Sequence, residues 1–221
     1  MLRPLYQVKV RMSNLGPMNY SAIIFDLGGV LFDIQYQKTA DAFRSLGLKD
    51  FDTLYSQAKQ DGLFDDFETG RSSAADFRER LRSRLGTNAT DQAIDHAWNA
   101  MLLGMTSDKI ELLSTLQAKY RIFLLSNTNE IHLTAVFRMM NQRFGFQDLS
   151  GFMEKQYFSC RIGMRKPDAE IFEFVLKEQG LSPAQTLFID DSIQHIEGAA
   201  RLGIQTHHLK NGEKIQEVFN S

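Results

Sequence analysis

The first clear hydrophobic run of the chain is short and ends in turn-forming residues. Residues 21–25 read Ser-Ala-Ile-Ile-Phe and are followed by Asp26 and by the pair Gly28 and Gly29. A run of this length, rich in β-branched and aromatic side chains and closed by glycine, is typical of a fully buried strand that ends in a tight turn. We therefore expect the first strand at residues 21–25.

The second half of the chain alternates between helical and extended patterns. Apolar residues recur at helical spacing in four segments, and four short apolar runs lie between or after them. Strands that alternate with helices predict βαβ units, and hence an α/β fold with a parallel sheet. The predicted helices cover residues 109–119, 130–140, 167–179 and 193–202, and the predicted strands cover residues 121–125, 157–160, 186–189 and 204–208.

The segment between the first strand and this alternating region has a different pattern. Phe77, Leu81 and Leu85 lie on one face of a predicted helix, and we find no strand-like run in the segment. This helical block is therefore expected to be an insertion into the α/β domain. The expected division is an N-terminal extension at 1–19, a core at 20–35 and 104–221, and a helical insertion at 36–103.

Composition and charge narrow the class of protein. Hydrophobic residues make up 43% of the 221 residues and charged residues 24%, which excludes global disorder. The formal net charge of −2 gives no reason to expect a nucleic-acid or membrane partner. The single cysteine, Cys160, excludes an intrachain disulfide and thiolate-rich zinc sites, so we expect a cytoplasmic protein.

The N-terminal extension, residues 1–19, is basic and contains no acidic residue. Basic leaders without acids occur as organellar targeting segments. Met12 and Met18 allow a second interpretation, in which the chain simply starts upstream of the folded domain. We favour this second interpretation.

Polar residues follow the predicted strands at their carboxyl ends, which share one edge of a parallel sheet and form the usual ligand site of such sheets. A single aspartate at a strand end often only forms a turn or caps a helix. Here, four separate segment ends agree, which makes a joint site the stronger interpretation. The residues are Asp26 after the first strand, Ser126 and Asn127 after the strand at 121–125, Lys166 before the helix at 167–179, and Asp190 and Asp191 after the strand at 186–189.

These residue types suit phosphoryl transfer. Carboxylates held close together repel each other unless a cation lies between them, and oxygen ligands suit Mg²⁺. A lysine supplies a compact positive charge, and the Ser126 hydroxyl and the Asn127 amide can bind phosphoryl oxygens. A carboxylate can also act as a covalent nucleophile.

The sequence resembles the haloacid dehalogenase superfamily of hydrolases over roughly residues 20–210. Its motifs match in order, and the details look most like the bacterial branch that includes α-D-glucose-1-phosphate phosphatases. The matching segments are Phe-Asp-Leu-Gly-Gly-Val at 25–30, Ser-Asn-Thr-Asn at 126–129, Gly-Met-Arg-Lys-Pro-Asp at 163–168, and Phe-Ile-Asp-Asp at 188–191 followed by Glu-Gly-Ala at 197–199.

The resemblance implies a Rossmann-like, three-layer core with an α-helical cap inserted after the first strand. It implies that Asp26 is the nucleophile and that Lys166 stabilises charge. Asp190 and Asp191 would hold Mg²⁺ together with Asp26 and the main-chain carbonyl of Gly28. The implied activity is hydrolysis of a small phosphorylated metabolite, possible substrates including sugar 1-phosphates.

One position departs from the pattern of most phosphatases in the superfamily. They carry a second aspartate, the general acid and base, where this chain has Gly28. A leaving group more acidic than a simple alcohol needs less protonation, and Asp33 is a candidate substitute acid or substrate contact. We expect His195 to support the metal carboxylates, whereas Arg165 and the cap residues 63–71 are weaker candidates for substrate contacts.

Two other functions remain open from the sequence. A 2-haloacid dehalogenase would use the aspartate to attack carbon and would need no metal, which the adjacent Asp190 and Asp191 argue against. A non-catalytic scaffold that binds metal or phosphate would explain the missing acid at Gly28.

Overall fold

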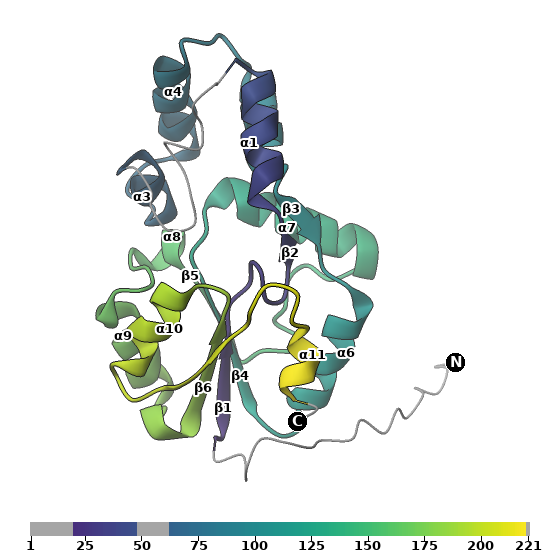
Figure 1. Ribbon diagram of the computed structural model, residues 1–221, viewed down its shortest axis with the longest axis vertical. Helices are drawn as coiled ribbons and strands as arrows, with labels where there is room; N and C mark the ends of the chain where they lie inside the picture. The colour runs from purple at the N-terminus through teal and green to yellow at the C-terminus, as the bar shows by residue number, and fades with distance from the viewer. Residues whose placement is uncertain (1–19, 48–61, 220–221) are drawn as a thin grey trace.

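A parallel sheet forms the centre of the protein in a computed structural model that describes residues 20–47 and 62–219 (Figure 1). Within these residues the sheet has five strands in the order β5-β4-β1-β6-β7, and every neighbouring pair is parallel. The predicted α/β fold class is therefore confirmed. The strands are β1 (Ala22–Phe25), β4 (Arg121–Ser126), β5 (Lys155–Phe158), β6 (Thr186–Asp190) and β7 (Gln205–His208).

Alternating side chains of the strands pack into two separate hydrophobic clusters, one on each face of the sheet. Ile23 and Phe25 of β1 belong to one cluster, whereas Ala22 and Ile24 belong to the other. Helices cover both faces, which gives three layers (Figure 1). The first face is covered by α6 (Ser107–Leu116), α7 (Glu130–Phe144) and α11 (Ile215–Val218), and the second by α9 (Ala169–Gln179) and α10 (Ile193–Ala200).

The helices inserted after β1 have a hydrophobic core of their own. Phe64, Phe77, Leu81 and Trp98 are fully buried in it, and Ile131 of α7 joins it from the α/β core. The insertion therefore packs against the beginning of α7, above the carboxyl end of the sheet (Figure 1). Its described helices are α1 (Tyr36–Ser45), α3 (Gly62–Glu68), α4 (Ala74–Leu85) and α5 (Asp91–Asn99).

A two-stranded antiparallel ribbon connects the insertion to the core. Strand β2 (Asp33–Ile34) pairs with β3 (Leu102–Gly104), and Ile34 lies opposite Leu102. The prediction that residues 36–103 contain no strand is wrong at this end. The extended form of residues 102–104 depends on a partner far away in the sequence, which a local pattern does not reveal.

One further local prediction is wrong. The strand predicted at 157–160 ends at Phe158, and a short helix, α8 (Ser159–Ile162), begins at the next residue. The segment after β7 contains α11, a helix that was not predicted, in which Ile215 and Val218 are buried. A short 3₁₀ helix, Pro183–Gln185, precedes β6. The N-terminal extension 1–19 lies outside the described residues, and no described helix is long and apolar enough to cross a membrane.

Candidate active site

Three carboxylates meet at the carboxyl end of the two central strands. Asp26 directly follows β1, Asp190 is the last residue of β6, and Asp191 comes next. One oxygen of each carboxylate lies within 4.8 Å of the others. Asp26 and Asp190 are buried, and Asp191 is half-buried. The parallel register of β1 and β6 is what places side chains so distant in sequence next to each other.

Lys166 forms the base of this carboxylate cluster. Its side chain is fully buried, and its Nζ lies 2.8 Å from Asp26 Oδ1 and 2.6 Å from Asp190 Oδ2. Asn127 fixes the main chain of Lys166 from both sides. The Asn127 amide nitrogen donates to the Lys166 carbonyl, the Lys166 N–H donates to Asn127 Oδ1, and both hydrogen bonds are 2.9 Å long.

This arrangement changes the interpretation of Asn127. The sequence suggested that its side chain binds substrate, but both polar atoms of that side chain already bind the main chain of Lys166. The Asn127 side chain therefore positions Lys166, and because Asn127 also lines the pocket, its contact with substrate stays a prediction. Ser126 is buried at the carboxyl end of β4 and lines the adjacent pocket, so its hydroxyl keeps the predicted location.

Burial and charge shift the pKa values of this cluster. Burial raises the pKa of Asp26 to about 6, because the opposing effect of Lys166 is only partial and Asp190 adds to the rise. Burial alone would raise the pKa of Asp190, but Lys166 and His195 lower it. Burial alone would lower the pKa of Lys166, but its two aspartates raise it.

The residues present fit a divalent cation. Three carboxylates face one lysine, so one Lys166 charge does not neutralise the cluster, and the ligand atoms are the hard oxygens that Mg²⁺ prefers. Asp190 already has three polar partners. Its oxygens accept hydrogen bonds from Lys166 and, at 2.8 Å, from the Ser192 N–H, and both oxygens lie 3.0 Å from His195 Nδ1. Asp26 and Asp191, which both line the pocket, are therefore better placed as direct ligands than Asp190.

The glycine pair after Asp26 has two different structural roles. Gly29 has a φ of 77°, and a Cβ atom there would lie 2.2 Å from Asp191 Oδ2. Only glycine leaves room for this carboxylate. A Cβ atom on Gly28 would lie 3.2 Å from Ile34 Cδ1, so Ile34 borders the space in which most phosphatases of the superfamily carry the second aspartate.

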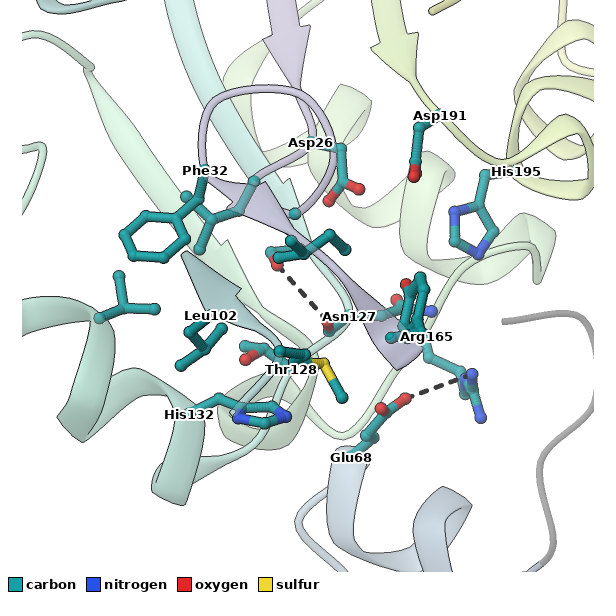
Figure 2. Close-up of a pocket in the computed structure, with 17 residues that line it drawn as sticks. Asp26, Phe32, Glu68, Leu102, Asn127, Thr128, His132, Arg165, Asp191 and His195 are labelled. Atoms are coloured by element: carbon teal, nitrogen blue, oxygen red, sulfur yellow. Dashed lines mark hydrogen bonds and ion pairs between the residues drawn. The ribbon is translucent and has the colours of Figure 1, made fainter. Parts of the chain in front are cut away.

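A pocket opens beside the carboxylates, and both the core and the insertion line it (Figure 2). Tyr36 of α1 and Glu68 of α3 contribute to its wall from the insertion. Glu68 Oε2 lies 3.3 Å from a guanidinium nitrogen of Arg165, which also pairs with Asp65. Arg165 therefore lines the pocket and at the same time links the core to the insertion.

The remaining candidates divide into those near the pocket and those away from it. His195 lines the pocket and contacts Asp190, as described above. Asp33 is not among the residues that line this pocket; it pairs with Lys109 at 2.6 Å and is half-exposed. His132, which is not among the site residues expected from the sequence, lines the pocket. The sequence contained a signal for this location, because His132 lies only three residues after the Ser-Asn-Thr-Asn segment at 126–129.

Comparison with known proteins identifies the family. Residues 20–203 match the haloacid dehalogenase-like hydrolase family. The chain belongs to this family. It is an enzyme of the hydrolase class, and the superfamily resemblance inferred from the motifs is confirmed.

Two curated relatives match this chain over most of their own length. The chain is 34% identical over 203 residues to a D-ribitol-5-phosphate phosphatase of Bacteroides thetaiotaomicron, covering 90% of this chain and 98% of the relative. It is 27% identical to a sesquiterpene phosphatase of Aspergillus oryzae, covering 86% and 90% of the two chains.

Solved structures give the same result. A family enzyme of Bacteroides thetaiotaomicron, an aspartate-to-alanine variant crystallised with magnesium and inorganic phosphate, has a TM-score of 0.86 at 34% identity and covers 90% of this chain and 98% of its own. An L-2-haloacid dehalogenase of Xanthobacter autotrophicus has a TM-score of 0.59 at 22% identity, covering 86% and 77% of the chains, and shares the fold.

Proposed function

We propose that this protein is a Mg²⁺-dependent phosphatase that hydrolyses a small phosphorylated metabolite through an aspartyl-phosphate on Asp26. The observation that carries this proposal is the buried Lys166, which contacts Asp26 and Asp190 under a cluster of three carboxylates. Such a cluster leaves negative charge for a divalent cation to neutralise. The similarity to a D-ribitol-5-phosphate phosphatase over almost its full length supports a sugar- or polyol-phosphate substrate.

The chain's own residues provide the groups for a two-step reaction. A carboxylate oxygen of Asp26 attacks phosphorus, the bond to the leaving oxygen breaks, and that oxygen keeps the electron pair and takes a proton from solvent water. A water oxygen then attacks the same phosphorus and gives up a proton to solvent. The Asp26–phosphorus bond breaks, its electrons return to the carboxylate, and inorganic phosphate leaves.

Each neighbouring group has a defined task in this proposal. Lys166 holds Asp26 in position and offsets the negative charge that accumulates on the phosphoryl oxygens, while the Ser126 hydroxyl donates to one of them. Asp26, Asp191 and the Gly28 carbonyl would hold Mg²⁺, with Asp190 supplying further negative charge and orienting Lys166. The cation, when bound, neutralises phosphoryl charge and aligns the phosphoryl group with Asp26.

The inserted helices would serve as a cap. We propose residues 36–103 as this cap and residues 20–35 and 104–221 as the catalytic core. Tyr36 and Glu68 line the catalytic pocket from the insertion, so the insertion shapes the space for the leaving group. A cap that closes over the bound substrate would also exclude bulk water from the site.

A substrate panel with Mg²⁺ tests the function. We expect inorganic phosphate to be released from pentitol 5-phosphates or from sugar 1-phosphates. The anomeric oxygen of a sugar 1-phosphate is the better leaving group, so it needs less help from the general acid that most phosphatases carry at the position of Gly28. EDTA should abolish turnover, and Mg²⁺ should restore it. Asp26→Asn, which keeps the shape of the side chain, should reduce turnover to background.

The same assay separates the two other candidate functions. If the protein releases chloride from a 2-haloacid even in the presence of EDTA, it is a dehalogenase and not a phosphatase. An L-2-haloacid dehalogenase shares the fold of this chain. Mg²⁺ binding without turnover of any phosphate ester would favour a scaffold. Either result would overturn the proposed function.

A further inference from the structure

His132 is held in one orientation at the boundary between the core and the insertion. It lies in the first turn of α7, and its main-chain N–H donates to Asn129 Oδ1 at 3.0 Å. Its ring stacks on Trp98, with the ring centroids 4.8 Å apart and the planes inclined by 17°. Its Nδ1 lies 2.9 Å from Asn99 Oδ1. The ring is thus fixed by contacts to α5 on one face and one edge.

The contact with Asn99 determines what the rest of the ring can do. An amide oxygen only accepts hydrogen bonds, so the proton of the neutral ring is on Nδ1, and Nε2 carries the lone pair. Nε2 is buried and has no hydrogen-bond partner among the described residues. Burial also lowers the pKa of His132 to about 3, so the ring stays neutral near pH 7. His132 therefore has one unused acceptor.

This histidine lines the catalytic pocket at a distance from the reacting groups. In Figure 2, His132 lies at the opposite end of the pocket from Asp26 and Asp191. Phe32 and Leu102 contribute apolar side chains to the same pocket, and Leu102 lies between Phe32 and His132 in Figure 2. A ligand whose phosphoryl group lies at Asp26 would extend its other end towards His132.

The other charged side chains of this region already have partners. Glu68 and Arg165 pair with each other, and Arg165 pairs with Asp65 as well. An unpaired buried acceptor is unfavourable, since it has lost its water and gained nothing in return. A hydroxyl group of a bound ligand would supply the missing donor.

We propose that His132 is a specificity-determining residue, whose Nε2 accepts a hydrogen bond from a hydroxyl group of the substrate's leaving group. This inference rests on the proposed phosphatase function and defines its substrate class: the phosphate monoester of a polyhydroxylated chain long enough to extend from Asp26 to His132. Asn99 and Trp98 act as positioning residues that present the Nε2 acceptor.

Two substitutions separate the two edges of the ring. His132→Asn keeps an amide nitrogen near Nδ1, where it can donate to Asn99, but removes the atom at Nε2. His132→Gln instead places an amide near Nε2, and its oxygen can accept. His96→Asn, at an exposed position of α5, is the matched control for the same chemical change elsewhere in the insertion.

The assay compares D-ribitol 5-phosphate with n-pentyl phosphate, which has the same chain length and no hydroxyl groups. We expect His132→Asn to lower the preference for the pentitol ester, the ratio of the two kcat/KM values, by roughly tenfold, the effect of one lost hydrogen bond. His132→Gln should restore most of this preference, and His96→Asn should leave it unchanged. Most of the loss should be in KM, because the contact is remote from phosphorus.

Equal loss of kcat/KM on both esters in His132→Asn would overturn the inference and leave His132 a structural residue. Wild-type kcat/KM on both esters in this variant would overturn it as well. The proposed function is tested separately by the wild-type protein on n-pentyl phosphate, which requires no hydroxyl contact. Wild-type hydrolysis of this ester with Mg²⁺ supports the phosphatase even where the His132 inference fails. No hydrolysis of either ester overturns the His132 inference for an open polyol chain, and the substrate panel described above then decides the phosphatase function separately.

Discussion

Gly29→Ala should impair metal binding, although Gly29 itself is not one of the proposed metal ligands. The added Cβ would lie 2.2 Å from Asp191 Oδ2 and 2.5 Å from Asp191 Cγ. Since real Cβ contacts essentially never fall under 3.0 Å, the carboxylate must retreat by about 0.8 Å or the loop must shift. Either movement separates Asp191 from Asp26. We expect Mg²⁺ affinity to fall at least about tenfold, as when a metal-positioning contact is lost, and turnover to fall about 10²-fold.

Backbone strain alone must be separated from this clash. Alanine at a positive φ costs about 1–2 kcal/mol, part of which is offset by the stiffer unfolded chain. Gly145, at the end of α7, has the same φ of 77° as Gly29, but a Cβ there would meet nothing within 4 Å. Gly145→Ala therefore reproduces the strain without the contact, and it serves as the matched control.

Three measurements on the two variants decide the question. Urea unfolding without metal should show a similar loss of stability in both, roughly 1 kcal/mol. Calorimetric titration with Mg²⁺ should show weakened binding in Gly29→Ala alone, and the phosphatase assay should follow the titration. Wild-type Mg²⁺ affinity in Gly29→Ala would refute the assignment of Asp191 as a ligand, and equal weakening in Gly145→Ala would attribute the effect to strain.

Three further predictions follow from the same contacts. Lys166→Met removes the ammonium group that pairs with the buried Asp26 and Asp190, so urea unfolding in EDTA should show a loss of about 3–5 kcal/mol, and added Mg²⁺ should stabilise this variant more than the wild type. Gly198→Ala places a Cβ 2.6 Å from the Pro167 carbonyl, next to Lys166, and should lower kcat about 10²-fold while Mg²⁺ still binds. His132 stays neutral when folded but gains a proton near pH 6.5 when unfolded, so it contributes a loss of about 2 kcal/mol of stability between pH 7 and pH 5; unfolding curves of His132→Gln should lack this part of the pH dependence.

The sequence was a good guide where structure is set by local pattern. The buried run before Asp26 and the apolar run before Ser126 are adjacent strands, and the carboxylates at 26, 190 and 191 do lie together. This followed from one physical rule, that parallel strands bring their carboxyl ends to one edge. The type of fold and the location of the site could therefore be predicted.

What the sequence did not reveal depends on partners distant along the chain. Strand β3 is extended because it pairs with β2, and the Asn127 side chain binds the main chain of Lys166 because two loops meet. The role of His132 depends on the insertion, whose Trp98 and Asn99 orient its ring. None of these contacts has a local signature, although the residue types involved are visible.

The most direct test of the mechanism is to detect the covalent phosphoryl group itself. Wild-type protein mixed with substrate and Mg²⁺ is quenched in acid within one turnover, and the peptide that contains Asp26 is analysed by mass spectrometry. We predict that this peptide gains the mass of one phosphoryl group on Asp26, that EDTA prevents the gain, and that Asp26→Asn never shows it. Release of phosphate at the normal rate, with Asp26 unmodified at every quench time, would contradict the proposed mechanism.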